Sequence, residues 1–349
     1  CMQEAICNYV KANPLGYTMT NPTYLEAVIS WYKRRHNCIL KKDWLTSAPN
    51  VITGLMWCIG AFTNAKDAIA VITPVYGAFG TSANDAQRQI IAVPMSRDGD
   101  NRYTVDYEAF ETAIIKHNVT LFIHCNPHNP VGHVWTESEM AQLFSICERH
   151  GVLIISDEIH QDLITGPIPF TPALAVSNGV YADNLISMSS LSKSFNMASL
   201  HHAEVIIPNE ELRDRYNTFK GLVYHTDSDV IAEAAITAAY THPEAEIWLA
   251  NLLAVVRENY DYLCHNLLVA LPKLRISPMD GTYLAWIDFG AYVKAEEMHD
   301  VFENRCGIAP SFGEWFGGES YATFVRLNLA TSLENIKIAT NSILQHIHP

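Results

Sequence analysis

The sequence lacks the patterns that mark several common classes of protein. No two of its eight cysteines form a C-x-x-C pair, so neither a zinc site nor a disulfide framework is expected. The longest basic run is Lys33-Arg34-Arg35 in a chain of net charge -14, which argues against a nucleic-acid partner. No apolar segment reaches the length of a membrane span, and no membrane partner is expected. These absences favour a cytoplasmic protein with buried free thiols, no bound metal and a small-molecule ligand.

What the sequence does contain is enough apolar material for a large core. Of its 349 residues 49% are hydrophobic and 17% are charged, without low-complexity tracts or short-period repeats. This composition is typical of a soluble globular enzyme, and the length suggests two domains.

The most informative stretch is Ser189-Ser190-Leu191-Ser192-Lys193-Ser194, which follows an apolar run at 184–188. Such a run before small polar residues predicts a buried strand that ends at a loop. A lysine there could anchor a carbonyl cofactor while the serines and backbone N–H groups hold a phosphate. On this motif alone, a surface lysine in a polar loop is the simpler interpretation.

Three other predicted strands end in residues that can carry chemistry. The strand at 68–72 leads to Tyr76, the strand at 121–125 leads to Asn129, and the strand at 151–155 leads to Asp157. Helical segments alternate with these strands, which predicts an α/β fold with a mostly parallel sheet covered by helices on both faces. The carboxyl ends of parallel strands share one edge, so all four sites describe a single ligand-binding edge.

A further junction resembles a phosphate cradle. A strand near 44–47 leads through Asn50 and Val51 into a helix that extends to residue 62. The free N–H groups and the dipole at a helix start attract anions.

The pattern changes near residue 245, where a long helix is followed by strands at 282–287 and 324–328 and a closing helix. We therefore expect a large domain at 17–244 and a smaller α+β domain built from 1–16 and 245–349. The first helix begins without a capping residue, and we expect that an N-terminal segment is missing from this sequence.

With these residues in view, the chain resembles fold-type I pyridoxal-phosphate enzymes of the class I/II aminotransferase family over its whole length. The motifs that carry the resemblance are Asn126-Pro127-His128-Asn129-Pro130-Val131-Gly132, Ser156-Asp157-Glu158, Ser190-Leu191-Ser192-Lys193 and Phe324-Val325-Arg326-Leu327-Asn328. Within the family it looks most like the cystathionine β-lyase (cysteine-S-conjugate β-lyase) branch. The motifs Asp157-Glu158-Ile159-His160, Lys193-Ser194-Phe195-Asn196 and Gly281-Thr282-Tyr283-Leu284-Ala285-Trp286 point to that branch.

The resemblance implies pyridoxal 5'-phosphate as the cofactor and a role for each matched residue. Lys193 matches the lysine that attaches to the cofactor aldehyde and later takes the substrate α-proton. Asp157 matches the carboxylate that faces the pyridine nitrogen, and Asn129 matches the amide that donates to the phenolic oxygen. Tyr76 matches the aromatic ring stacked on the cofactor, and Arg326 matches the arginine that grips the substrate α-carboxylate.

The phosphate pocket of the family matches Ser190, Ser192 and the backbone N–H groups at Asn50 and Val51. Tyr17 matches a catalytic-site tyrosine that in relatives reaches the phosphate of the neighbouring subunit. The resemblance therefore implies a homodimer with shared active sites.

Two positions depart from the common aminotransferase pattern. His201, next to His202, stands where many aminotransferases have an arginine for the phosphate. His160 stands where aminotransferases usually have a tyrosine that tunes the cofactor oxygen, as it does in the lyase branch. The second departure favours a lyase.

Three functions stay open at this stage. The leading hypothesis is a pyridoxal-phosphate-dependent C–S β-lyase that cleaves cystathionine or a related cysteine conjugate to pyruvate, ammonia and a thiol. The alternative is an aminotransferase of α-amino acids that uses the same residues. The third is a catalytically silent pyridoxal-phosphate-binding regulatory protein, against which the intact Lys193, Asp157 and Arg326 argue.

Overall fold

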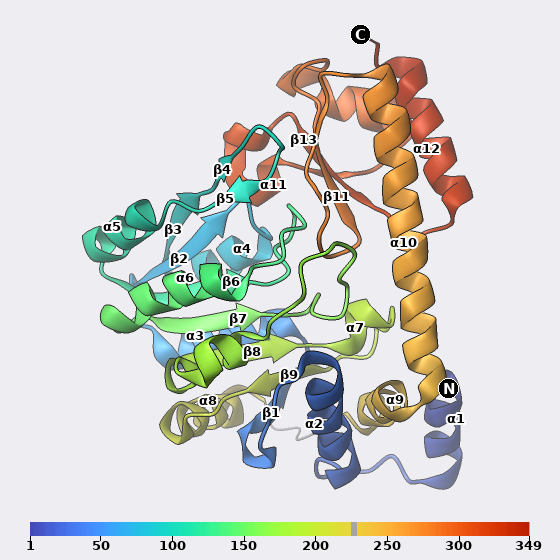
Figure 1. Cartoon of the computed structure of the whole chain (residues 1–349). Coiled ribbons are helices and arrows are strands. Elements are labelled where there is room, and N and C mark those ends of the chain that lie inside the picture. The colour runs from blue at the N-terminus through green and yellow to red at the C-terminus, as the bar shows by residue number, and fades with distance from the viewer. Residues whose placement is uncertain (225–228, 349) are drawn as a thin grey trace.

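The computed structural model describes residues 1–224 and 229–348, and within them two sheets and their covering helices form the architecture (Figure 1). The larger sheet has the strand order β1-β9-β8-β7-β6-β2-β3. Its strands are β1 (Leu45–Ala48), β2 (Ala68–Thr73), β3 (Gln89–Pro94), β6 (Val119–Cys125), β7 (Leu153–Asp157), β8 (Leu185–Ser189) and β9 (Ala203–Ile206). Strand β9 runs antiparallel to both its neighbours, while β8, β7, β6, β2 and β3 pair in parallel. The expected α/β fold with a mostly parallel sheet is confirmed.

Helices cover both faces of this sheet because its strands bury alternate residues on opposite sides. In β2, Ala70 and Ile72 pack into one core cluster, and Ile69 and Val71 pack into the other. The first face is covered by α2 (Pro22–His36), α5 (Tyr107–His117), α6 (Glu137–Arg149) and α9 (Val230–Thr241). The second is covered by α3 (Val51–Phe62), α4 (Ala78–Asp85) and α8 (Glu210–Val223).

The second sheet has the order β10-β11-β13-β12 and belongs to the C-terminal third of the chain. Its antiparallel strands are β10 (Arg275–Ile276), β11 (Leu284–Asp288), β12 (Ser311–Phe312) and β13 (Phe324–Asn328). The helices α10 (Pro243–Ala270) and α12 (Leu333–His346) lie against it (Figure 1). The remaining α-helices and strands are α1 (Met2–Ala12), α7 (Leu191–Ser194), α11 (Glu314–Gly317) and the hairpin β4 (Ser96–Arg97) with β5 (Tyr103–Thr104).

The first helix does not return to the C-terminal sheet. Helix α1 lies against α9, beside the start of α10 (Figure 1). The division into 17–244 and 1–16 with 245–349 therefore stays a prediction, and the contacts of α1 speak against its place in the smaller unit. In the described part of the chain, no helix is both long and apolar enough to cross a membrane.

The core contains a carboxyl group, that of Glu204 on β9, which has no hydrogen-bond partner among the described residues. Glu204 is fully buried, and within the described residues both of its carboxyl oxygens lack a hydrogen-bond partner. Burial raises the pKa of Glu204 to about 8. Because an unfolded glutamate titrates near pH 4.3 or so, the folded state holds one proton more than the unfolded state between these values.

We therefore expect stability to fall as pH rises from about 5 to 8, by up to about 1.4 kcal/mol per pH unit from Glu204 alone. The substitution Glu204→Gln removes this titrating group and should make that part of the profile less steep, so that the variant gains stability relative to the parent at pH 8. Thermal midpoints measured from pH 5 to 8 test this, with exposed Glu211→Gln as the control. Equal slopes for parent and Glu204→Gln would contradict the expectation.

Candidate active site

One cavity of about 720 Å³ lies where the carboxyl ends of the parallel strands meet the C-terminal sheet. Its volume is in the range of small-molecule sites. Nine of the eleven residues expected at the site line it: Asn50, Val51, Tyr76, Asn129, Asp157, His160, Ser192, Lys193 and Arg326. Ser190 and Tyr17 do not.

The lysine reaches the cavity because a capped turn of helix follows β8. The Ser190 hydroxyl accepts a hydrogen bond from Ser192 N–H (3.1 Å), which caps α7 at its start. The same hydroxyl donates to the backbone oxygen of His202 (2.7 Å). Ser190 is thus buried as a structural cap, and Lys193 extends from the turn that it fixes.

Asp157 ends β7 inside the cavity wall. One of its carboxyl oxygens accepts the Ile159 N–H (3.0 Å). Burial raises the pKa of Asp157 to about 6, although the Ile159 N–H and the charge of Lys193 oppose the rise. A buried carboxyl group of this kind suits a cationic partner, and a protonated pyridine nitrogen is such a partner.

His160 is a neutral ring in the same wall. Burial, with the charges of Lys193 and Arg326 adding to it, lowers the pKa of His160 to about 3. Its Nδ1 atom has no partner among the described residues, and its ring meets Tyr283 edge-on with centroids 5.6 Å apart. The ring can therefore exchange a hydrogen bond with a ligand but cannot supply a positive charge.

Asn129 and Arg326 hold each other in position. Arg326 donates to the side-chain oxygen of Asn129 (2.8 Å) and to the Ser311 hydroxyl (3.0 Å). Because a guanidinium group only donates, the Asn129 oxygen must face it, which leaves the Asn129 NH₂ free to donate elsewhere. The Nε of Arg326 is buried without a partner, and no carboxylate pairs with Arg326 within residues 1–224 and 229–348. An anionic ligand would meet this unmatched charge.

The start of α3 forms another part of the cavity wall. Asn50 caps this helix by accepting the Thr53 N–H (2.8 Å), so the earlier N–H groups of the first turn, at Val51 and beyond, are left for a ligand. Ser192 lines the same cavity. Together these donors fit a phosphate group.

The structure separates the two adjacent histidines that depart from the common pattern. His201 lines the cavity. His202 is buried in the core, where its Nε2 and the Tyr24 hydroxyl share a hydrogen bond of 2.7 Å and burial lowers the pKa of His202 to about 4. Of the two, only His201 is placed to replace the missing arginine.

Two tyrosines from the expected set differ in their surroundings. Tyr76 lines the cavity and meets Phe79 and Trp315 edge-on, with ring centroids 5.8 and 5.0 Å apart. Tyr17 is 102% exposed and lies outside the cavity. Its expected role stays a prediction that depends on a second subunit.

Comparison with known proteins identifies the family to which the chain is similar. The family model for aminotransferase class I and II matches residues 11–343. The chain is 31% identical to cystathionine β-lyase PatB of Bacillus subtilis, with 96% of this chain and 85% of the relative aligned.

Solved structures give the same picture. Cystalysin of Treponema denticola, whose structure contains pyridoxal 5'-phosphate, superposes with a TM-score of 0.94 at 27% identity, over 99% of this chain and 86% of that one. The pyridoxal-phosphate-bound C–S lyase of Staphylococcus hominis superposes with a TM-score of 0.91 at 28% identity, over 99% and 87%.

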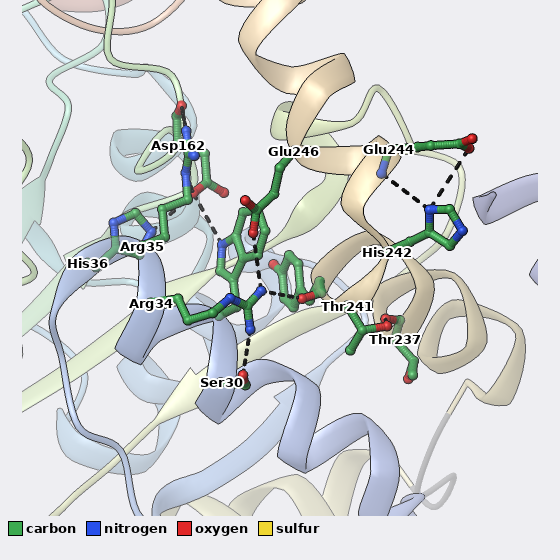
Figure 2. Close-up of polar contacts among 12 residues, drawn as sticks. Ser30, Arg34, Arg35, His36, Asp162, Thr237, Thr241, His242, Glu244 and Glu246 are labelled. Atoms are coloured by element: carbon green, nitrogen blue, oxygen red, sulfur yellow. Dashed lines mark hydrogen bonds and ion pairs between the residues drawn. The ribbon is translucent and has the colours of Figure 1, made fainter.

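Asp162, which the sequence motifs did not single out, stabilises the turn that carries Lys193. Asp162 is buried and accepts hydrogen bonds from Arg35 Nε (2.9 Å) and Trp31 Nε1 (3.2 Å) of α2, with His36 Nε2 at 3.0 Å (Figure 2). Its other oxygen accepts the Ser194 hydroxyl (2.9 Å), next to Lys193. Burial alone would raise the pKa of Asp162, but these partners hold it below its ordinary value.

We expect Asp162→Asn to destabilise the fold by about 2–3 kcal/mol, because it removes the negative charge and one of the two acceptor oxygens that the partners of Asp162 share. Solvent screens part of the interaction with Arg35, because the Arg35 side chain is 30% exposed. Thermal or urea unfolding of this variant and of a matched control measures the loss of stability. The matched control is Asp261→Asn, which breaks an exposed pair with Arg257 and should cost less than about 0.5 kcal/mol. Similar losses in the two variants would show that Asp162 is no anchor.

Proposed function

The chain belongs to the class I and II aminotransferase family, and from this membership we propose that it is a pyridoxal-phosphate-dependent C–S β-lyase. Its substrate is L-cystathionine or a related cysteine S-conjugate. Water and the conjugate give pyruvate, ammonia and a thiol. The names of the similar relatives and structures support this reaction.

The observation that carries the choice of lyase over aminotransferase is His160. Its ring is buried and neutral, at the position where the family resemblance leads us to expect a tyrosine in aminotransferases. Elimination needs the Cα–H and Cβ–S bonds aligned with the π system of the cofactor ring. Amino transfer needs, in addition, a proton delivered to the cofactor carbon. Hydrogen bonding at the phenolic oxygen of the cofactor helps to set the balance between elimination and amino transfer. The imidazole of His160 would make this hydrogen bond differently from the phenol of a tyrosine.

The residues of the cavity have the following roles in the proposal. When bound, pyridoxal phosphate supplies an aldehyde for the substrate amino group and a ring that delocalises the electron pair left at Cα. Lys193 takes the α-proton, and the released pair expels the sulfur from Cβ as a thiolate. Asp157 keeps the ring nitrogen protonated, while Asn129 donates to the phenolic oxygen. Arg326 holds the α-carboxylate through a fork of donors.

When the cofactor is bound, Tyr76 would stack on its ring, and the start of α3 with Ser192 would hold its phosphate. Ser190 shapes the phosphate site through the turn that it caps, and its expected direct contact with the phosphate stays a prediction. His201 is placed to add a donor on the phosphate side.

We also propose a homodimer in the cytoplasm. Leu15, Tyr17 and Met19 are exposed apolar or aromatic side chains on one short segment, and such a patch suits a subunit contact. In the dimer, Tyr17 would reach the phosphate of the partner subunit. All eight cysteines are free, which suits a reducing compartment.

The reaction itself is tested with L-cystathionine. We expect pyruvate and homocysteine, with transamination of alanine or aspartate at least about tenfold slower, which corresponds to about 1.4 kcal/mol in barrier. Pyruvate release and keto-acid-dependent amino transfer are measured on one preparation. Amino transfer as fast as elimination would favour an aminotransferase, and absence of both would favour the silent binding protein.

Lysine variants provide the control for this assay. Lys193→Ala should lose both activities and the cofactor adduct that borohydride reduction fixes, whereas exposed Lys116→Ala should keep them. An adduct mapped by mass spectrometry to another lysine would contradict the role of Lys193.

Shared active sites are tested by mixing two defective variants. Tyr17→Ala and Lys193→Ala, unfolded and refolded together in equal amounts, should regain about a quarter of the parent sites, because half of the dimers are mixed and one site in each is intact. Sedimentation checks that the mixture is dimeric. A fully active monomer, or no recovery in a mixed dimer, would rule out sharing.

A further inference from the structure

A second cavity of about 550 Å³ shares part of its wall with the active-site cavity. Tyr76, Ser311 and Arg326 line both cavities, so the two meet at these side chains. We call the second cavity the side groove. Its remaining walls come from the C-terminal part of the chain: His299, Phe312, Glu314 and Trp315.

Trp315 is held in place although nearly half of it is exposed. Its segment is attached to the loop after β2 by a hydrogen bond from Val75 N–H to Phe316 O (2.9 Å). The Trp315 ring meets Tyr76 edge-on at 5.0 Å and lies so close to Gly77 that a Cβ there would come within 2.7 Å of the ring. Yet 47% of the Trp315 surface remains exposed. The packing therefore orders an indole face at the groove, where a ligand can use it.

The charges of the side groove favour a cation. In the proposed reaction the substrate α-carboxylate matches the charge of Arg326, and the Glu314 carboxylate then remains. His299 is already engaged, since its ring stacks on Phe312 at 3.6 Å and its Nδ1 lies 3.3 Å from Glu303. An aromatic face beside a carboxylate is a suitable environment for an ammonium group.

We propose that the side groove receives the sulfur substituent of the cysteine conjugate and favours a substituent that ends in an ammonium group. The inference rests on the proposed β-lyase function, in which Arg326 holds the amino-acid end. The substituent on Cβ then extends past Arg326, and Trp315 and Glu314 determine specificity for it.

A series of conjugates that differ in the substituent tests the proposal. S-(2-aminoethyl)-L-cysteine carries an ammonium group, S-propyl-L-cysteine has the same length without charge, and S-(2-carboxyethyl)-L-cysteine carries a carboxylate. We expect kcat/KM to decrease in this order, by about three- to fivefold for the first step, as for a partly exposed charge on an aromatic face. S-methyl-L-cysteine, which does not fill the groove, is the reference.

Variants separate the two contributions. Glu314→Gln should remove the preference for aminoethyl over propyl. Trp315→Ala should lower kcat/KM for both long substrates at least about fivefold more than for S-methyl-L-cysteine, and Trp315→Phe should restore part of the loss. Exposed Glu319→Gln is the charge control and should leave all ratios unchanged.

Two further measurements separate failure of this inference from failure of the proposed function. β-Chloro-L-alanine has no large substituent, so its conversion to pyruvate tests elimination without the groove. Calorimetric binding of L-lysine and L-2-aminoheptanoate, which have no C–S bond, tests the groove without elimination, and tighter binding of L-lysine in the parent but not in Glu314→Gln is expected. Elimination that proceeds normally, with no ammonium preference and with equal losses for all substrates in Trp315→Ala, overturns the inference alone.

Discussion

Burial of titratable groups at the carboxyl end of the large sheet is the constraint on which the active site depends. It moves Asp157 and His160 in opposite directions, since the pKa of the first rises to about 6 and that of the second falls to about 3. Both changes favour the neutral form. Arg326, in contrast, keeps a charge that no carboxylate of the described chain matches. In the proposed function, the cationic ring nitrogen of the cofactor would pair with Asp157 and the substrate carboxylate with Arg326.

Lys193, the lysine proposed to react, is positioned through its neighbours in sequence. Ser190 ties the start of its turn to the backbone at His202, and Ser194 ties the end to Asp162. Asp162 is in turn held by α2, more than a hundred residues earlier in the chain (Figure 2). The position of Lys193 is thus set by hydrogen bonds to groups that never meet the ligand, which is how a side chain on a four-residue helix can be held in place.

The strands and the cavity could be predicted from local patterns, because buried strands are continuous apolar runs and their ends carry the polar motifs. The capping box of Thr136 and Glu139 at the start of α6 is likewise a purely local signal, and it is present. What local patterns missed depends on partners distant in sequence. His201 and His202 look alike in the sequence, but β9 turns the second toward Tyr24. Ser190 stays a predicted phosphate ligand, and the local pattern did not show that its hydroxyl is also bonded to backbone groups at Ser192 and His202.

The side groove is also a feature that depends on partners distant in sequence, since Trp315 is positioned by its contact with the loop at Gly77. Lys193 and Asp157, proposed to act in the reaction, lie at strand ends of the large sheet. Four residues line the side groove but not the active site, and three of these belong to the segment that contains β12 and α11. The groove can therefore change without disturbing Lys193 or Asp157, provided that Arg326 keeps its bond to Ser311. A relative with the same reacting residues is consequently a better guide to the bond that is broken than to the leaving group that is preferred. Specificity for that group has to be read from the residues of the groove itself, and in this chain those are an indole and a carboxylate.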